Sequence, residues 1–153
     1  MTSPTATLLD EHAAISSLIR LLQTEQDKLT AADIDELPAV TTEKAVIVAR
    51  MSGLANQRQL ALMAAGLSPE QNGMDQWIAQ TSDNAARSLW QELLSLARSA
   101  EELNRINGKL INQHATHNQN ALDILQGVPV GGNFYGANGK SMTKPPSGKL
   151  IIG

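Results

Sequence analysis

Residues 83–125 decide the fold of this chain, and they read DNAARSLWQELLSLARSAEELNRINGKLINQHATHNQNALDIL. One set of positions in this stretch returns every three or four residues, which is the period of a single face of an α-helix. We call this face the seam; it consists of Leu89, Leu93, Leu96, Ala100, Leu103, Asn107, Leu110, His114, His117, Ala121 and Ile124. The pattern predicts one helix of about 40 residues, or roughly 60 Å. A helix of that length predicts an elongated molecule, because it exceeds the diameter of a compact domain of this size.

Two further helices are predicted upstream. The first spans about 25 residues, has Thr5 or Thr7 as its cap, and ends in a bend at 30–33. The second follows the capping-box spacing of Asp33 and Glu36, although Pro38 can shift its start, and it ends at Gly66. A loop with a short helix is predicted over 68–81. We therefore expect an all-α fold, an elongated antiparallel bundle in which the first two helices both run antiparallel to the long one.

Composition excludes several classes of protein. The 153 residues include 20 Leu and 20 Ala but only four aromatic residues and no Cys, which favours helix and rules out disulfides and thiolate metal sites. No apolar stretch approaches the roughly 20 residues that span a bilayer, so we expect a cytoplasmic protein without membrane insertion. A net charge of -3 argues against nucleic acid as a partner.

The charge and the glycines divide the chain near residue 127. Residues 127–153 contain three Lys, no acidic residue, seven of the eleven Gly and three of the six Pro, so this segment has a charge of +3 and the rest has -6. Such a composition is typical of a segment without helix. We predict a helical bundle domain over 1–126 and a flexible basic tail over 127–153.

The residues that could carry chemistry are few. His114 and His117 are about one helical turn apart and could chelate a metal, but no acidic residue lies at a matching step, so we expect no metal site. Adjacent acidic residues on a helix point in different directions, and no phosphate-binding loop or nucleophile triad is present. We therefore predict no catalytic residues, no cofactor and no enzyme activity.

Three polar residues fall on the apolar faces of the predicted helices. For Asn107 we favour a polar layer that fixes the register of the bundle. Lys44 and Arg58 have two interpretations. In the simpler one their aliphatic stems cover the core while the charges reach water. In the other, an ion pair with Glu25 of the first helix sets the register of the two helices.

The tail also carries apolar residues that a purely solvating segment does not need. Phe134 and Tyr135 are half of all the aromatic residues in the chain. Such residues either anchor a partner when the tail orders on binding or dock back on the bundle, and the sequence leaves both open.

These segments together resemble the FlgN-type flagellar export chaperones. The resemblance rests on LLDEHAAISSLIRLLQTEQDKL at 8–29, EKAVIVARMSGLANQR at 43–58, WQELL at 90–94, LNRINGKLI at 103–111 and the tail motif from Tyr135 to Gly139. Each segment alone is mostly heptad pattern. Their order and spacing, the Asn-rich run and the tail motif make the resemblance specific.

The resemblance implies a non-catalytic binding protein. Members of this family escort the hook-filament junction proteins FlgK and FlgL, whose helical terminal region they bind, to the export gate component FlhA. By the same resemblance, Tyr135 matches the tail tyrosine associated with gate docking. The expected partner-binding residues are Leu122, Leu125, Val128, Val130, Phe134, Tyr135 and Gly139.

A different class of function fits the helical pattern as well. A non-catalytic coiled-coil scaffold that tethers other proteins would leave apolar faces uncovered in the monomer and would associate tightly. A dedicated chaperone is compatible with a monomer or a weak homodimer.

Overall fold

The computed structural model describes residues 2–127, in which all regular structure is helical. The four helices are α1 (Leu8–Thr30), α2 (Leu37–Ala64), α3 (Gln71–Thr81) and α4 (Asn84–Leu125). Contacts divide the chain into two units, Met1–Leu110 and Ile111–Gly153, of which the described parts are 2–110 and 111–127. No helix in the described part is both long and apolar enough to cross a membrane.

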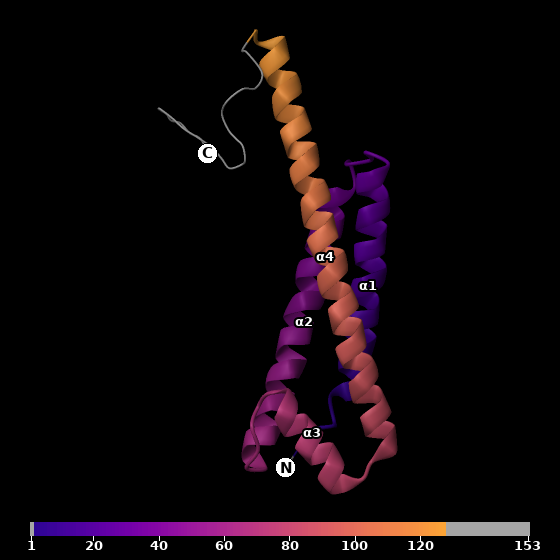
Figure 1. Ribbon diagram of the computed structural model, residues 1–153, viewed down its shortest axis with the longest axis vertical. Helices are drawn as coiled ribbons and strands as arrows, with labels where there is room; N and C mark the ends of the chain where they lie inside the picture. The colour runs from indigo at the N-terminus through magenta and orange to yellow at the C-terminus, as the bar shows by residue number, and fades with distance from the viewer. Residues whose placement is uncertain (1, 128–153) are drawn as a thin grey trace, which may run out of the picture. The chain divides into compact units, whose positions relative to one another are not determined.

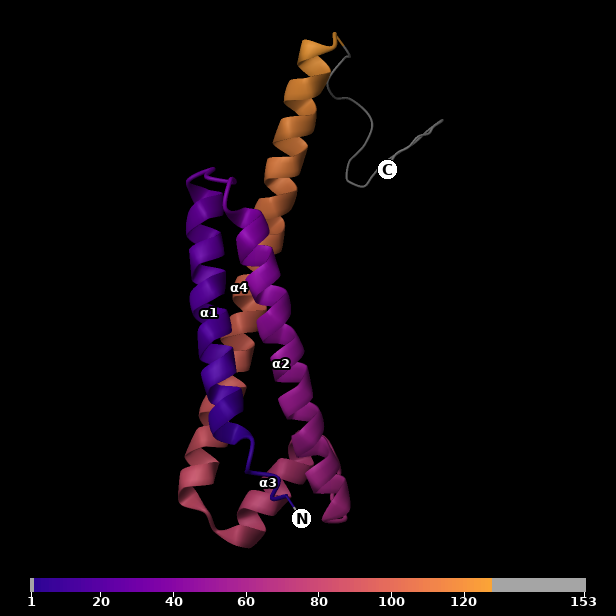
Figure 2. The same cartoon turned by 180° about the vertical axis from the view of Figure 1, so that it is seen from behind.

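The first unit is a bundle of three helices with α3 across one end. Figures 1 and 2 show α1, α2 and the first part of α4 side by side, with α3 connecting α2 to α4. The core is built from leucine, isoleucine, methionine and alanine around a single tryptophan. Its buried members are Leu8, Ile15, Leu18, Leu22, Leu62, Met74, Ile78, Ala86, Trp90, Leu93 and Ala100. The predicted all-α helical bundle is confirmed.

The direction of α1 corrects one expectation. His12 contacts Glu92, and further along both helices Glu25 contacts Asn107, so α1 and α4 run parallel. Only α2 runs antiparallel to them. Since the short turn at 31–36 reverses the chain between α1 and α2, these two helices cannot both be antiparallel to a third.

The ends of the helices follow local chemistry, with two corrections. Thr7 precedes α1, but its hydroxyl makes no cap hydrogen bond and donates instead to Glu11 Oε2 at 2.8 Å. The capping box of Asp33 and Glu36 is absent because Pro38 moves the first turn of α2, which begins at Leu37. At the start of α4 the side chain of Asp83 does act as a cap, since its Oδ1 accepts from Ala86 N at 3.0 Å.

Two glycines make the turn from α2 into α3 possible. Gly66 has φ +79, and the backbone N–H of Leu67 donates to the carbonyl of Leu62 at 2.9 Å, which is a Schellman ending. A Cβ on Gly73 would lie 1.8 Å from the carbonyl oxygen of Ser68, so no larger residue fits there without moving the backbone. These contacts hold α3 where Met74 and Ile78 enter the core.

Candidate partner-binding segment

Polar layers inside the bundle fix which residues face one another. Lys44 Nζ lies 3.1 Å from both carboxylate oxygens of Glu25. Arg58 donates to Glu11 from Nε at 3.0 Å and from Nη2 at 3.1 Å, and its Cζ lies 4.9 Å from the centroid of the Trp90 ring. The simpler interpretation of Lys44 and Arg58, with the charges reaching water, is therefore wrong. The ion pair with Glu25 is confirmed for Lys44, whereas the partner of Arg58 was not anticipated.

Asn107 completes the layer at Glu25. Its side chain is 1% exposed, and Nδ2 donates to the carbonyl of Leu22 and to Glu25 Oε1, both at 2.8 Å. The predicted polar layer at Asn107 is confirmed. The Glu25 carboxylate, the Lys44 ammonium and the Asn107 amide nitrogen pair with one another inside the bundle, while the buried Asn107 side-chain oxygen has no hydrogen-bond partner among the described residues. We assign this layer to register and look elsewhere for a binding surface.

The segment 111–127 is the second unit as far as it is described, and it exposes its apolar side chains. Leu122 is 49% exposed, Ile124 66% and Leu125 83%, while Ile111 is 43% exposed. Ile111 precedes Leu122 by eleven residues, or about three helical turns, and Leu125 follows by three, so these three side chains share one face. A helical face of this kind matches the apolar face of another helix.

The opposite side of this segment is mostly polar and almost uncharged, with Ile124 as an exposed apolar residue on it. Gln119 Nε2 donates to Asp123 Oδ1 at 3.0 Å, four residues apart on the helix. Asn112, Thr116 and Asn120 line a shallow surface hollow together with Gln113 and His117. Side-chain amides of this kind offer donors and acceptors but little long-range electrostatic attraction.

The structure brings two of the predicted site residues together. Leu122 and Leu125, which the family resemblance implies, are three residues apart and are neighbours on one face of α4. Val128, Val130, Phe134, Tyr135 and Gly139 lie outside the described residues. Ile111 and Ile124 are also exposed on this segment but are not among the predicted site residues; the sequence signal for Ile111 is its spacing of eleven residues from Leu122.

The two histidines of this segment, His114 and His117, are the candidate metal ligands of the sequence. Among residues 2–127 no group of three or more His, Asp or Glu side chains is placed to hold an ion. His114 is half-buried and His117 is exposed.

Comparison with known proteins identifies the family. The family model described as FlgN protein matches residues 1–143. The chain belongs to the FlgN family. The match includes the whole bundle, the exposed end of α4 and most of the tail.

Curated FlgN relatives cover nearly the same length. The chain is 27% identical over 139 residues to the flagella synthesis protein FlgN of Proteus mirabilis, which covers 90% of this chain and 88% of the relative. It is 26% identical over 147 residues to the FlgN of Salmonella typhimurium, with 94% of each chain covered. The FlgN of Escherichia coli is 28% identical over 149 residues, with 95% and 96% covered. No solved structure matches the chain. The FlgN family, to which this chain belongs, is thus involved in flagellar synthesis.

Proposed function

We propose that this chain is a cytoplasmic export chaperone without catalytic activity. It binds the helical terminal region of the unassembled hook-filament junction proteins FlgK and FlgL and delivers them to the export gate protein FlhA. The observation that carries the proposal is the exposed apolar end of α4, at Leu122, Ile124 and Leu125, in a member of the FlgN family.

The exposed leucines suit a helical client. Burying a leucine side chain fully is worth about 2 kcal/mol, so Leu122 and Leu125 supply a substantial part of a helix-in-groove contact. An unassembled subunit exposes a similar apolar face that would otherwise associate wrongly. Covering one face with the other keeps the subunit soluble until release.

The tail extends this surface in sequence. Residues 128–153 contain Phe134 and Tyr135 as well as three lysines. A segment that orders only on contact loses conformational entropy, which keeps the complex reversible. We propose that the tail holds the client together with α4, and that Tyr135 takes part in docking at the gate.

Titration calorimetry against the C-terminal helical region of the organism's FlgK tests this function. We expect saturable binding by the full chain and loss of binding by a version that ends at Gly127, with an unchanged helical circular dichroism spectrum. The Leu122→Ala/Leu125→Ala variant tests the contribution of α4 separately from that of the tail, and it should weaken binding by about a hundredfold.

A matched control changes the polar side of the same segment. Asn112→Ala/Asn120→Ala keeps the helix and both leucines, so it should bind as the wild type does. Equal affinity for FlgK in the truncated chain and the full chain would refute the role of the tail. No binding by the full chain would refute the chaperone function.

A further inference from the structure

The outer surface of α2 carries apolar side chains that the bundle does not cover. Val46 is 65% exposed, Leu60 53% and Met63 50%. The inner side of the same helix contributes Leu62 to the core. α2 is thus apolar on its outer side as well, which a surface helix in contact with water alone does not require.

This outer surface is also nearly free of charge. Between residues 45 and 64 the charged residues are Arg50 and Arg58. Arg58 turns inward to Glu11, so Arg50 is the one exposed charge on this part of α2.

The exposed residues follow a regular spacing centred on Gly53. Val46 lies seven residues before Gly53 and Leu60 seven after it, while Ala49 and Gln57 lie four residues to either side. Positions seven and four apart share one helical face. A Cβ placed on Gly53 has no neighbour within 4 Å, so the centre of this face is open.

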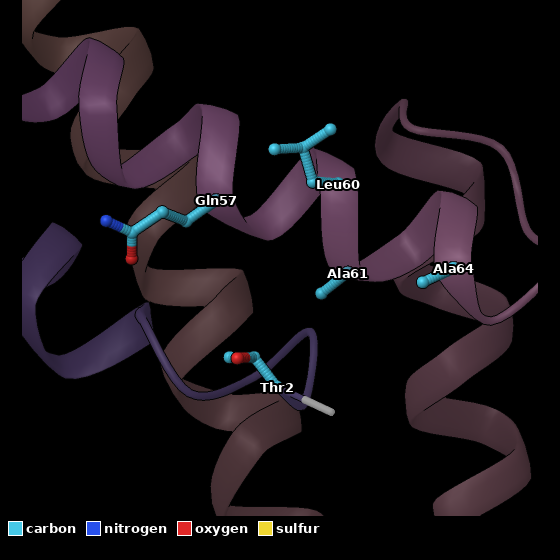
Figure 3. A pocket seen from close by; sticks show the side chains of 5 residues that line it. All are labelled: Thr2, Gln57, Leu60, Ala61 and Ala64. Atoms are coloured by element: carbon cyan, nitrogen blue, oxygen red, sulfur yellow. The ribbon is translucent and has the colours of Figure 1, made fainter.

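One end of the face is hollowed. Gln57, Leu60, Ala61 and Ala64 line a depression of about 320 Å³ whose other wall includes Thr2. Figure 3 shows the Gln57 and Leu60 side chains on α2 with Thr2 on the facing N-terminal segment. The small side chains of Ala61 and Ala64 leave room there for an apolar group from a partner.

We infer that this face binds a second copy of the chain, with the two α2 helices antiparallel about a two-fold axis at Gly53. In that arrangement Gly53 faces Gly53 of the second copy. Val46 faces Leu60 of the second copy beside the hollow, and Ala49 faces Gln57 of the second copy. This isologous pairing uses the same patch twice.

The pairing is also compatible in charge. Arg50 faces Asn56 of the second copy, so no like charges meet and a guanidinium lies opposite an amide oxygen. A parallel pairing would instead bring Arg50 against Arg50. Gly53 has no side chain at the crossing point, which lets the two helix backbones approach closely.

The size of the face sets the strength of the dimer. Residues 46–64 extend about 27 Å along α2, and a strip one helix wide offers less than the roughly 800 Å² per partner of a standard interface. We therefore expect a weak dimer that depends on concentration. The inference does not depend on the proposed client, because the face lies on α2 and the client segment on α4.

Sedimentation of the full chain between about 1 and 300 µM tests the inference, with dissociation expected in the micromolar range. Ala49→Glu/Gln57→Glu places carboxylates opposite each other across the axis and should weaken the dimer at least about tenfold. Ala49→Glu/Gln57→Lys should restore it. The two positions are about 12 Å apart within one helix, so the rescue requires the antiparallel partner.

Cross-linking tests the register. The chain has no cysteine, so Gly53→Cys introduces a thiol that faces itself across the axis and should form a disulfide-linked dimer on mild oxidation. Val48→Cys is the matched control, because Val48 is 47% exposed on another side of α2 and its thiol should form no disulfide-linked dimer.

Four outcomes would overturn the inference. Two of them are a monomer at every concentration and a dimer that the two glutamates leave unchanged. The third is found by labelling the Gly53→Cys variant with maleimide. If the thiol is protected to the same degree at every protein concentration, the face is covered by the chain's own tail. The fourth is protection that appears only with FlgK, which would assign the face to the client.

Discussion

Glu11 and Glu25 on α1 face Arg58 and Lys44 on α2, and in both pairs the residue numbers add to 69, the constant sum of an antiparallel pairing. Both acids are nearly buried, with side-chain exposures of 7% and 2%. The two pairs are 14 residues apart on each helix, which is two heptads. A slip of either helix by one heptad would break both pairs and leave charges buried without partners.

The pair of Glu11 and Arg58 should therefore show strong coupling. Glu11→Gln leaves the Arg58 guanidinium with a neutral partner in a site that is largely dry, and we expect a loss of about 3 kcal/mol in the free energy of unfolding. Glu11→Leu/Arg58→Met removes both charges and should cost much less than the sum of Glu11→Leu alone and Arg58→Met alone. Urea denaturation of the double-mutant cycle measures the coupling, and additive effects would contradict it.

Asn107→Asp should destabilise the bundle in a way that depends on pH. The change places a second carboxyl beside Glu25 at a position that is 1% exposed, and we expect a loss of about 2 kcal/mol or more near neutral pH. Repulsion raises the pKa of the shared site above its unfolded value, so stability should recover as the pH falls through that pKa. Denaturation at several pH values checks this. Asn112→Asp, on an exposed position of α4, should show no such recovery.

Gly73→Ala should unfold the connection between α2 and α3. The new Cβ would lie 1.8 Å from the Ser68 carbonyl oxygen, so the backbone must move, and we expect a loss of about 2 kcal/mol. Gly108→Ala is the matched control. Nothing lies within 4 Å of a Cβ there, and alanine should stabilise the interior of α4 by about 0.5 to 1 kcal/mol. Thermal melts of both variants distinguish the two cases, and equal melting temperatures would contradict the close approach at Gly73.

The exposed pair at the turn between α1 and α2 should be visible by titration. Lys28 Nζ donates to Glu36 Oε1, which lowers the pKa of Glu36 and raises the pKa of Lys28. The stabilisation from Glu36 is present above its unfolded pKa and is lost as the pH falls through the folded value. The stabilisation from Lys28 is lost as the pH rises through the folded pKa of Lys28. Lys28→Met should move the NMR titration midpoint of Glu36 upward.

Glu102 is the internal control for this titration. Its pKa is lowered mainly by a hydrogen bond from Arg105 on α4, whereas Lys28 lies on α1 and Glu36 just before α2. Lys28→Met should therefore leave the Glu102 midpoint unchanged. A shift of both midpoints would point to a general change in the bundle rather than to the loss of one hydrogen bond.

Most of the helices could be predicted because their signals are local. The three-four spacing of apolar residues, Gly66 as a stop and Asp83 as a start are properties of a few consecutive residues, and each reappears in the structure. The predicted capping box at Asp33 was wrong because Pro38 sets the position of the first turn of α2, which begins at Leu37. Leu122 and Leu125 were predicted by family resemblance, whereas Ile124 belongs to the seam and was expected to pack.

The sequence by itself determined which residues are helical and which side of each helix is apolar, because periodicity is written in the spacing of side chains along one segment. Only the tertiary structure decided which helix each side meets: that α1 runs parallel to α4, that Arg58 binds Glu11, and that no other part of residues 2–127 covers the outer face of α2. A heptad pattern is the same for any neighbouring helix and for either direction. Which helices become neighbours, and in which direction they run, depends on turns and on polar pairs between residues such as Asn107 and Leu22, which are 85 positions apart.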